Sequence, residues 1–99
     1  MDAVPRLELL RSKRREIFEV LDSYGATNPR IVGSVARGDD RPESDIDLML
    51  DMPEELSLLD VIGLERQLSD LLGSTVEVCE EDGLPAKVAG IMLAEAVIL

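Results

Sequence analysis

Residues 33–50, GSVARGDDRPESDIDLML, decide the fold, because two acids near the end of this stretch alternate with apolar side chains. Successive side chains of a strand point to opposite faces of a sheet, so Asp45 and Asp47 share one face. The apolar residues on the other face are Ile46, Leu48 and Leu50. Two neighbouring carboxylates repel each other unless a proton or a cation intervenes. The pattern therefore predicts a core strand over 46–50 that carries a metal-binding pair.

The composition excludes several classes of function. The chain has 99 residues, 21 of them acidic and 10 basic, which gives a formal net charge of −11. This sign is wrong for direct binding of nucleic acid through its phosphates. The absence of histidine excludes Ser-His-Asp chemistry, Cys-His chemistry and ordinary zinc sites. We expect a single domain over 1–99 whose catalysis, if any, uses carboxylates, Ser, Arg or Lys.

Cysteine content and hydropathy favour the cytoplasm. Cys79 is the only cysteine, and no signal peptide opens the chain. The apolar segment 84–99 is interrupted by Lys87 and Glu95 and is too short to span a bilayer. We expect no membrane association, and we interpret Cys79 as a packing residue.

Three segments predict helices. Residues 6–24, which follow Pro5, have apolar side chains every three to four residues. This segment carries four basic residues, Arg11, Lys13, Arg14 and Arg15. They are interpreted either as a solvated face or as a patch that contacts nucleotide or a partner. Residues 57–72 form the second helix, with Ser57 as N-cap. The apolar face that this helix is expected to turn toward the protein core is Leu58, Val61, Leu64, Leu68 and Leu71. The third helix is expected over 85–98.

Two further strands and the tail complete the prediction. A buried strand is expected at 30–32, and another at 75–79, where Glu77 points away from the core as a third acid. The apolar end 96–99 is interpreted either as core or as an interface with a partner or a second copy. The order of elements predicts an α+β, two-layer fold: a small mixed β-sheet flanked by helices.

A second group of residues lies where the first strand ends. Gly33 allows close approach of the backbone to a ligand, and Ser34 is expected to cap the next helical turn. The N–H groups of Val35 and Ala36 would then point at a bound phosphate. A Gly-Ser pair alone is usually only a tight turn, and an Asp-x-Asp alone is usually solvated charge. Together with a third acid, they predict a Mg²⁺-dependent site for phosphoryl chemistry.

These motifs resemble the nucleotidyltransferase superfamily that includes DNA polymerase beta. More narrowly, GSVARGDDRPESDIDLML, the Leu-rich helix, TVEV and the closing AEAVIL resemble the minimal nucleotidyltransferase (MNT) proteins, antitoxin-type partners of HEPN toxins. The resemblance implies a nucleotidyltransferase-like fold. The residues it assigns to nucleotide binding are Gly33, Ser34, Arg37 and Ser44. Those it assigns to metal binding and catalysis are Asp45, Asp47 and Glu77. Glu77 stands where the family usually has aspartate, and its side chain is one methylene longer.

The resemblance implies Mg²⁺-dependent transfer of AMP from ATP to a tyrosine of a HEPN-type RNase toxin, which silences the toxin. Residues 39–55 hold eight acids against one base, Arg41, and would steer a basic partner toward the site. The alternative is a non-catalytic acidic antitoxin that inhibits its partner by contact alone, as the net charge and Glu77 suggest. A different acceptor and a homo-oligomer both stay open.

Overall fold

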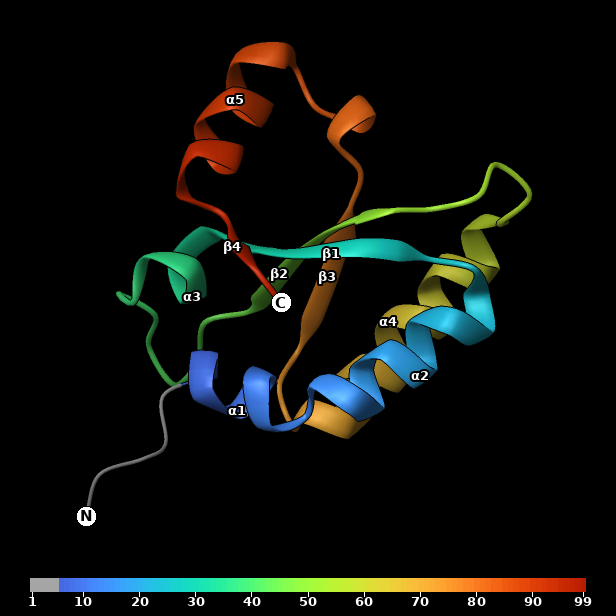
Figure 1. The fold of residues 1–99 in the computed structure, drawn as a ribbon, viewed down its shortest axis with the longest axis horizontal. Coiled ribbons are helices and arrows are strands. Elements are labelled where there is room, and N and C mark those ends of the chain that lie inside the picture. The colour runs from blue at the N-terminus through green and yellow to red at the C-terminus, as the bar shows by residue number, and fades with distance from the viewer. Residues whose placement is uncertain (1–5) are drawn as a thin grey trace.

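The computed structural model describes residues 6–99 and contains one four-stranded sheet with helices against both faces (Figure 1). The strands are β1 (Thr27–Val32), β2 (Ile46–Asp51), β3 (Val76–Cys79) and β4 (Val97–Ile98). The helices are α1 (Arg6–Ser12), α2 (Arg14–Tyr24), α3 (Gly33–Arg37), α4 (Leu58–Leu72) and α5 (Ala86–Glu95), with a 3-10 turn, η1 (Glu81–Gly83). The predicted α+β class is confirmed.

The sheet is mixed, with the strand order β3-β2-β1-β4. β1 runs antiparallel to β2 and to β4, whereas β2 runs parallel to β3. The register places Val32, the last residue of β1, opposite Asp47, and it places Asp47 beside Glu77 of β3. The sheet therefore brings the end of the first strand and two of the three predicted acids to one place.

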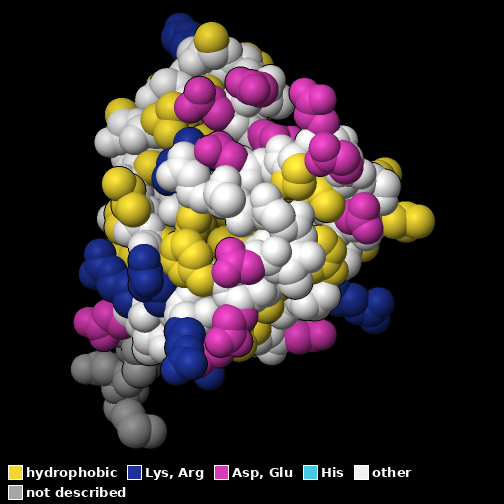
Figure 2. Space-filling view, turned by 45° about the vertical axis from the view of Figure 1, so that its right-hand side comes forward, with side chains coloured by type: hydrophobic (Ala, Val, Ile, Leu, Met, Phe, Trp, Pro, Cys, Tyr) yellow, Lys and Arg dark blue, Asp and Glu magenta, His cyan; other side chains and the backbone are white. Residues whose placement is uncertain are grey.

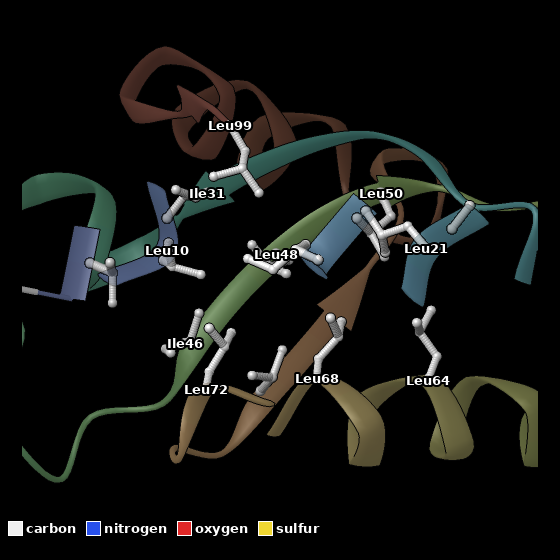
Figure 3. Close-up of a cluster of buried hydrophobic side chains, with 14 residues drawn as sticks. Leu10, Leu21, Ile31, Ile46, Leu48, Leu50, Leu64, Leu68, Leu72 and Leu99 are labelled. Atoms are coloured by element: carbon white, nitrogen blue, oxygen red, sulfur yellow. The ribbon is translucent and has the colours of Figure 1, made fainter. Parts of the chain in front are cut away.

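One face of the sheet carries the main core (Figure 3). The apolar residues of β2 that alternate with its acids are fully buried there, as predicted: Ile46, Leu48 and Leu50. They pack with the inward side chains of α4, which are Leu64, Leu68 and Leu72. Helices α1 and α2 add Leu10, Ile17 and Leu21 to the same cluster. The alternation of Asp47 with Ile46 and Leu48 thus places this carboxylate on the face opposite the main core.

Helix α4, the second of the three predicted helices, begins where the sequence predicts. The Ser57 hydroxyl accepts a hydrogen bond from the Asp60 N–H at 3.1 Å, and the Asp60 carboxylate accepts one from the Ser57 N–H at 2.9 Å. The predicted apolar face is wrong at its first position, however, because Leu58 is 76% exposed. Leu58 precedes Leu68 by ten residues. At about 100° per residue, its side chain therefore lies about 80° around the helix axis from that of buried Leu68.

The predicted helix over 6–24 is two helices, α1 and α2, which meet at Lys13. The Ser12 hydroxyl donates to the Leu9 carbonyl at 2.7 Å, a local bond that competes with continuation of the helix. Both helices still bury their apolar side chains in one core, since Leu10 and Ile17 are each 0% exposed. Pro5 lies outside the described residues.

The predicted helix over 85–98 is too long. α5 ends at Glu95, and Val97 and Ile98 form β4 along β1. The pairing supplies partners for backbone groups that would otherwise leave β1 as an open edge. Leu99 is buried, as the core interpretation of 96–99 requires, whereas Ile98 is 81% exposed.

The first strand is longer than predicted. It begins at Thr27 rather than at Arg30, and its pairing with β2 is irregular between these two residues. Asn28 there has φ of 55°, so the turn-like Asn-Pro pair survives as an irregularity inside the strand.

The second face of the sheet lies under α5, on the side opposite α1, α2 and α4 (Figure 1). Val32 and Met49 are fully buried there, and Ala89 of α5 is 5% exposed. This is also the face toward which Asp47 and Glu77 point, since they alternate with core residues. Within residues 6–99, no helix combines the length and the apolar character needed to cross a bilayer.

Candidate active site

The three predicted acids lie at neighbouring positions of β2 and β3. Asp47 is half-buried in β2, and Glu77 is exposed beside it in β3. Asp45 is exposed and immediately precedes β2, whose first N–H, from Ile46, donates to the Thr75 carbonyl at 2.9 Å. Two adjacent strands thus hold the acids on a rigid part of the fold.

Gly33 lies directly against the Asp47 carboxylate. A Cβ at Gly33 would stand 2.7 Å from Oδ2 of Asp47, closer than side-chain carbons approach oxygen. The backbone there also has φ of 73°, in the left-handed region that favours glycine. The structure therefore brings together two motifs that are fourteen residues apart in the sequence.

Asp47 lies in an environment that disfavours its charge. Burial raises the pKa of the Asp47 carboxyl above its ordinary value, and the charges of Glu77 and then Asp45 raise it further. Repulsion from two other carboxylates is what a bound cation would reverse. The electrostatics therefore favour a cation at this face, as the alternation of acids predicts.

The donor set agrees with magnesium in kind. Among residues 6–99, no group of three or more Asp, Glu, His or Cys side chains lies close enough to hold a metal ion. Mg²⁺ takes oxygen ligands and is usually held by one or two carboxylates together with substrate phosphates, so Asp45 and Asp47 fit it. The assignment of Glu77 as a further ligand stays a prediction.

Helix α3 begins two residues earlier than the Gly-Ser pair predicts. The N-cap position is Val32, so Ser34 lies within the first turn, and the expectation that Ser34 caps the helix is wrong. The cause is the left-handed Gly33, which turns the chain into the helix directly from the strand. The amides of this first turn still have no intrahelical acceptor, which leaves them for a ligand.

Arg37 and Ser44 are bonded to protein groups. The Arg37 guanidinium donates to Asp39 and to Glu95 of α5, both at 3.2 Å, and these hydrogen bonds raise its pKa. The Ser44 hydroxyl accepts from the Arg41 N–H at 2.9 Å and so closes a turn before Asp45. Their assignment to nucleotide binding is not tested by these contacts.

The sequence gives no signal for the role of Arg6. This side chain is 13% exposed, and its guanidinium donates to the carbonyls of Arg41, at 2.8 Å, and of Pro42 and Ser44. It also lies 3.9 Å from the Asp40 carboxylate. A residue from the first described helix therefore holds the loop that delivers Asp45.

We expect Arg6→Ala to lower nucleotidyl transfer about tenfold, because the loop before Asp45 loses three hydrogen bonds from a charged donor. The free energy of unfolding should fall by about 1–3 kcal/mol. Turnover assays and urea unfolding measure the two effects. Arg15→Ala is the control, since the Arg15 side chain is 88% exposed and its guanidinium pairs with Glu19 of the same helix at 3.6 Å. An unchanged turnover in Arg6→Ala would contradict this role.

A small cavity opens beside the acids. It has a volume of about 220 Å³ and is lined by Asp47, Glu77, Val78, Cys79, Leu84 and Met92. Burial and the charge of Asp47 raise the pKa of the Cys79 thiol, against the lowering effect of Arg30. This direction agrees with Cys79 as a packing residue, because the reactive form of cysteine is the thiolate.

The nucleotidyltransferase domain model matches residues 10–99. The chain belongs to this nucleotidyltransferase family. A solved minimal nucleotidyltransferase is 39% identical, with a TM-score of 0.82 over 94% of this chain and 95% of that chain. Protein adenylyltransferase MntA of Thermococcus cleftensis is 34% identical over 79 residues, 80% of each protein. The predicted membership in the minimal nucleotidyltransferases is confirmed, and with it the enzyme class.

A more distant structure shares only the fold. A toxin-antitoxin complex solved with AMP-PNP contains a chain that is 17% identical, with a TM-score of 0.72 over 85% of this chain and 69% of that chain. Nucleotidyltransferases of this family use a nucleoside triphosphate together with a divalent metal ion. The acids on β2 and β3 therefore belong to a fold that its family uses to bind nucleotides.

Proposed function

We propose that this nucleotidyltransferase is an antitoxin that transfers AMP from ATP to a tyrosine hydroxyl of a HEPN-type RNase toxin. The observation that carries the proposal is the contact of Gly33 with the Asp47 carboxylate, beside Glu77 in register. Relatives named protein adenylyltransferases, and a toxin-antitoxin complex of the same fold, support the choice of reaction and partner. We place the reaction in the cytoplasm.

Different residues of the site would bind the metal ion and the phosphates. Asp45 and Asp47 would hold Mg²⁺, which when bound neutralises the triphosphate and the charge that develops on it. The amides of the first turn of α3, at Gly33 and Ser34, would donate to the phosphates. Arg37 is paired with Glu95, so a phosphate that binds Arg37 would compete with the ion pair between α3 and α5. Ser44 would contribute by fixing the turn before Asp45.

The reaction is an in-line displacement at the α-phosphorus. The tyrosine oxygen forms a bond to that phosphorus while the bond to the bridging oxygen of the β-phosphate breaks, and pyrophosphate leaves. The hydroxyl proton passes to the Glu77 carboxylate, which is exposed and faces the same side as Asp47. The protein contributes mainly positioning and charge.

The test mixes this protein with Mg²⁺, α-labelled ATP and a HEPN-type RNase toxin, and follows the label by gel and intact mass. The doubly substituted variant Asp45→Asn/Asp47→Asn is the control. Label on a tyrosine of the partner, absent with the control, is the expected result. Label on neither chain would reject the proposed reaction.

Inhibition by contact alone is the second candidate. The extra methylene of Glu77 and the lack of a three-residue metal cluster among residues 6–99 favour it. This candidate predicts that Asp45→Asn/Asp47→Asn still neutralises the toxin fully while no AMP is transferred by either protein. A loss of neutralisation in that variant would reject it.

We expect Glu77→Gln to slow AMP transfer about 100-fold, because the variant keeps the shape of the side chain and removes the proton acceptor. Glu77→Asp should retain more activity than Glu77→Gln, because it keeps the carboxylate. The rate of transfer, measured at saturating Mg²⁺ and ATP, separates these variants. Equal rates for Glu77→Gln and Glu77→Asp would show that Glu77 takes no proton.

A further inference from the structure

Three large aliphatic side chains are exposed together at the start of α4. Leu58 is 76% exposed, Leu59 78% and Ile62 49%. Ile62 lies four residues after Leu58 and three residues after Leu59, so its side chain neighbours both of them on the helix surface. We call these three residues the α4 patch. Single exposed apolar residues are ordinary, whereas adjacent ones on a soluble surface mark an interaction site.

The packing of α4 does not need these side chains. The helix is already anchored in the core by Leu64, Leu68 and Leu72, which are 0%, 0% and 5% exposed. At about 100° per residue, Leu59 and Ile62 project from the side of the helix opposite Leu68. The α4 patch therefore exposes apolar area that nothing in the described fold covers.

The side of the patch toward the preceding loop is acidic. Residues 51–62 contain four acids and no base, whereas the exposed Arg66 lies one turn beyond Ile62. Glu54 and Glu55 of the preceding loop are exposed, as is Asp51 at the end of β2. Figure 2, in which the side of the molecule bearing this loop comes forward, shows hydrophobic side chains interspersed with Asp and Glu. An apolar centre with a charged rim is the usual anatomy of a protein interface.

We propose that the α4 patch docks a protein face that has an apolar centre and a rim of Lys and Arg, namely the toxin of the proposed function, on which this inference rests. The acidic rim selects such a partner by charge complementarity. A second copy of this chain fits poorly, because a two-fold contact would set Glu54 and Glu55 of both copies against each other.

The position of the patch separates docking from catalysis. The patch follows the far end of β2, beyond Asp51 and the loop after it, whereas Asp47 lies near the start of that strand (Figure 1). The partner can therefore rest on α4 and leave the cavity beside Asp47 and Glu77 open to ATP. The acceptor tyrosine then belongs to a segment of the partner that extends from the docked face toward the site.

The test measures the affinity of the HEPN-type protein for this chain in the absence of ATP. The variant Leu58→Gln/Leu59→Gln/Ile62→Gln replaces the apolar centre by glutamine, a residue that also forms helices well. The matched control is Val88→Gln/Ile91→Gln, which removes two exposed aliphatics of α5, 43% and 57% exposed. A third variant, Glu54→Gln/Glu55→Gln, removes rim charge. Thermal unfolding and Mg²⁺-dependent ATP binding confirm that each variant is folded.

We expect the α4 variant to bind about 10- to 100-fold more weakly and the α5 control to bind as the wild type does. Glu54→Gln/Glu55→Gln should slow association and reduce its dependence on salt. Wild-type affinity in the α4 variant, loss of binding in the α5 control, or a dimer of the free chain that the α4 variant dissociates would each overturn the inference. If the wild-type chain does not bind the HEPN-type protein at all, both the docking surface and the proposed partner are rejected. Loss of binding in the α4 variant without AMP transfer by the wild type would support the docking surface and reject the reaction.

Discussion

Asp47→Asn should reduce AMP transfer by about three orders of magnitude while leaving the protein at least as stable as the wild type. The carboxylate is half-buried, stands beside Glu77 and is repelled by Asp45, so its charge is unfavourable in the folded state. Asparagine has the same shape without this charge, and it cannot hold Mg²⁺ as a carboxylate does. Labelled-AMP transfer and thermal unfolding measured on the same preparations report the two effects.

The pH dependence of stability gives an independent check of the same residue. Because the pKa of Asp47 is raised in the folded state, the folded protein keeps a proton that the unfolded chain releases. The contribution of Asp47 to stability therefore decreases as pH rises from the unfolded pKa, about 3.9, through the folded pKa. In Asp47→Asn this decrease should disappear. Asp70→Asn, an exposed acid of α4, is the control and should leave both activity and pH dependence unchanged. A destabilised Asp47→Asn would show that the carboxylate is favourably bonded.

Gly33→Ala should reduce AMP transfer at least 100-fold and lower the free energy of unfolding by about 1–3 kcal/mol. The two effects have different causes. The loss of stability comes from φ of 73°, which alanine adopts only with strain. The loss of activity comes from the new Cβ, 2.7 Å from Oδ2 of Asp47. The carboxylate is the end of a side chain and can rotate away, so the contact should be relieved at the expense of its position.

Gly73→Ala separates these causes. Gly73 has φ of 68°, and a Cβ there would meet no atom within 4 Å. Its loss of stability should match that of Gly33→Ala, because the backbone strain is the same, while its activity should stay at the wild-type level. Chemical unfolding and transfer assays on both variants provide the comparison. Equal activities in the two alanine variants would show that Gly33 does not position Asp47.

The sequence by itself determined the elements that depend on local periodicity and capping. β2 was predictable because Asp45 and Asp47 alternate with core residues, and α4 because Ser57 and Gly73 delimit it. The acids were predictable as a group, since alternation alone assigns Asp45 and Asp47 to one face. The family resemblance rested on these same motifs, which is why it was sufficient to identify the enzyme class.

Only the tertiary structure decided how these elements meet. The pairing of β1 with β2 places Gly33 against Asp47, and the parallel pairing of β2 with β3 places Glu77 beside it. The role of Arg6 depends on carbonyls more than thirty residues away, for which a sequence carries no periodic signal.

The same holds for two of the errors in the helices and for the docking surface. Val97 and Ile98 form a strand because β1 offers an unpaired edge, although the local sequence is also compatible with a helix. Leu58 is exposed because it lies about 80° from buried Leu68 around the helix, at an end of α4 whose burial depends on neighbouring elements. Local interactions along the chain thus set the elements, whereas contacts between residues distant in sequence set the site.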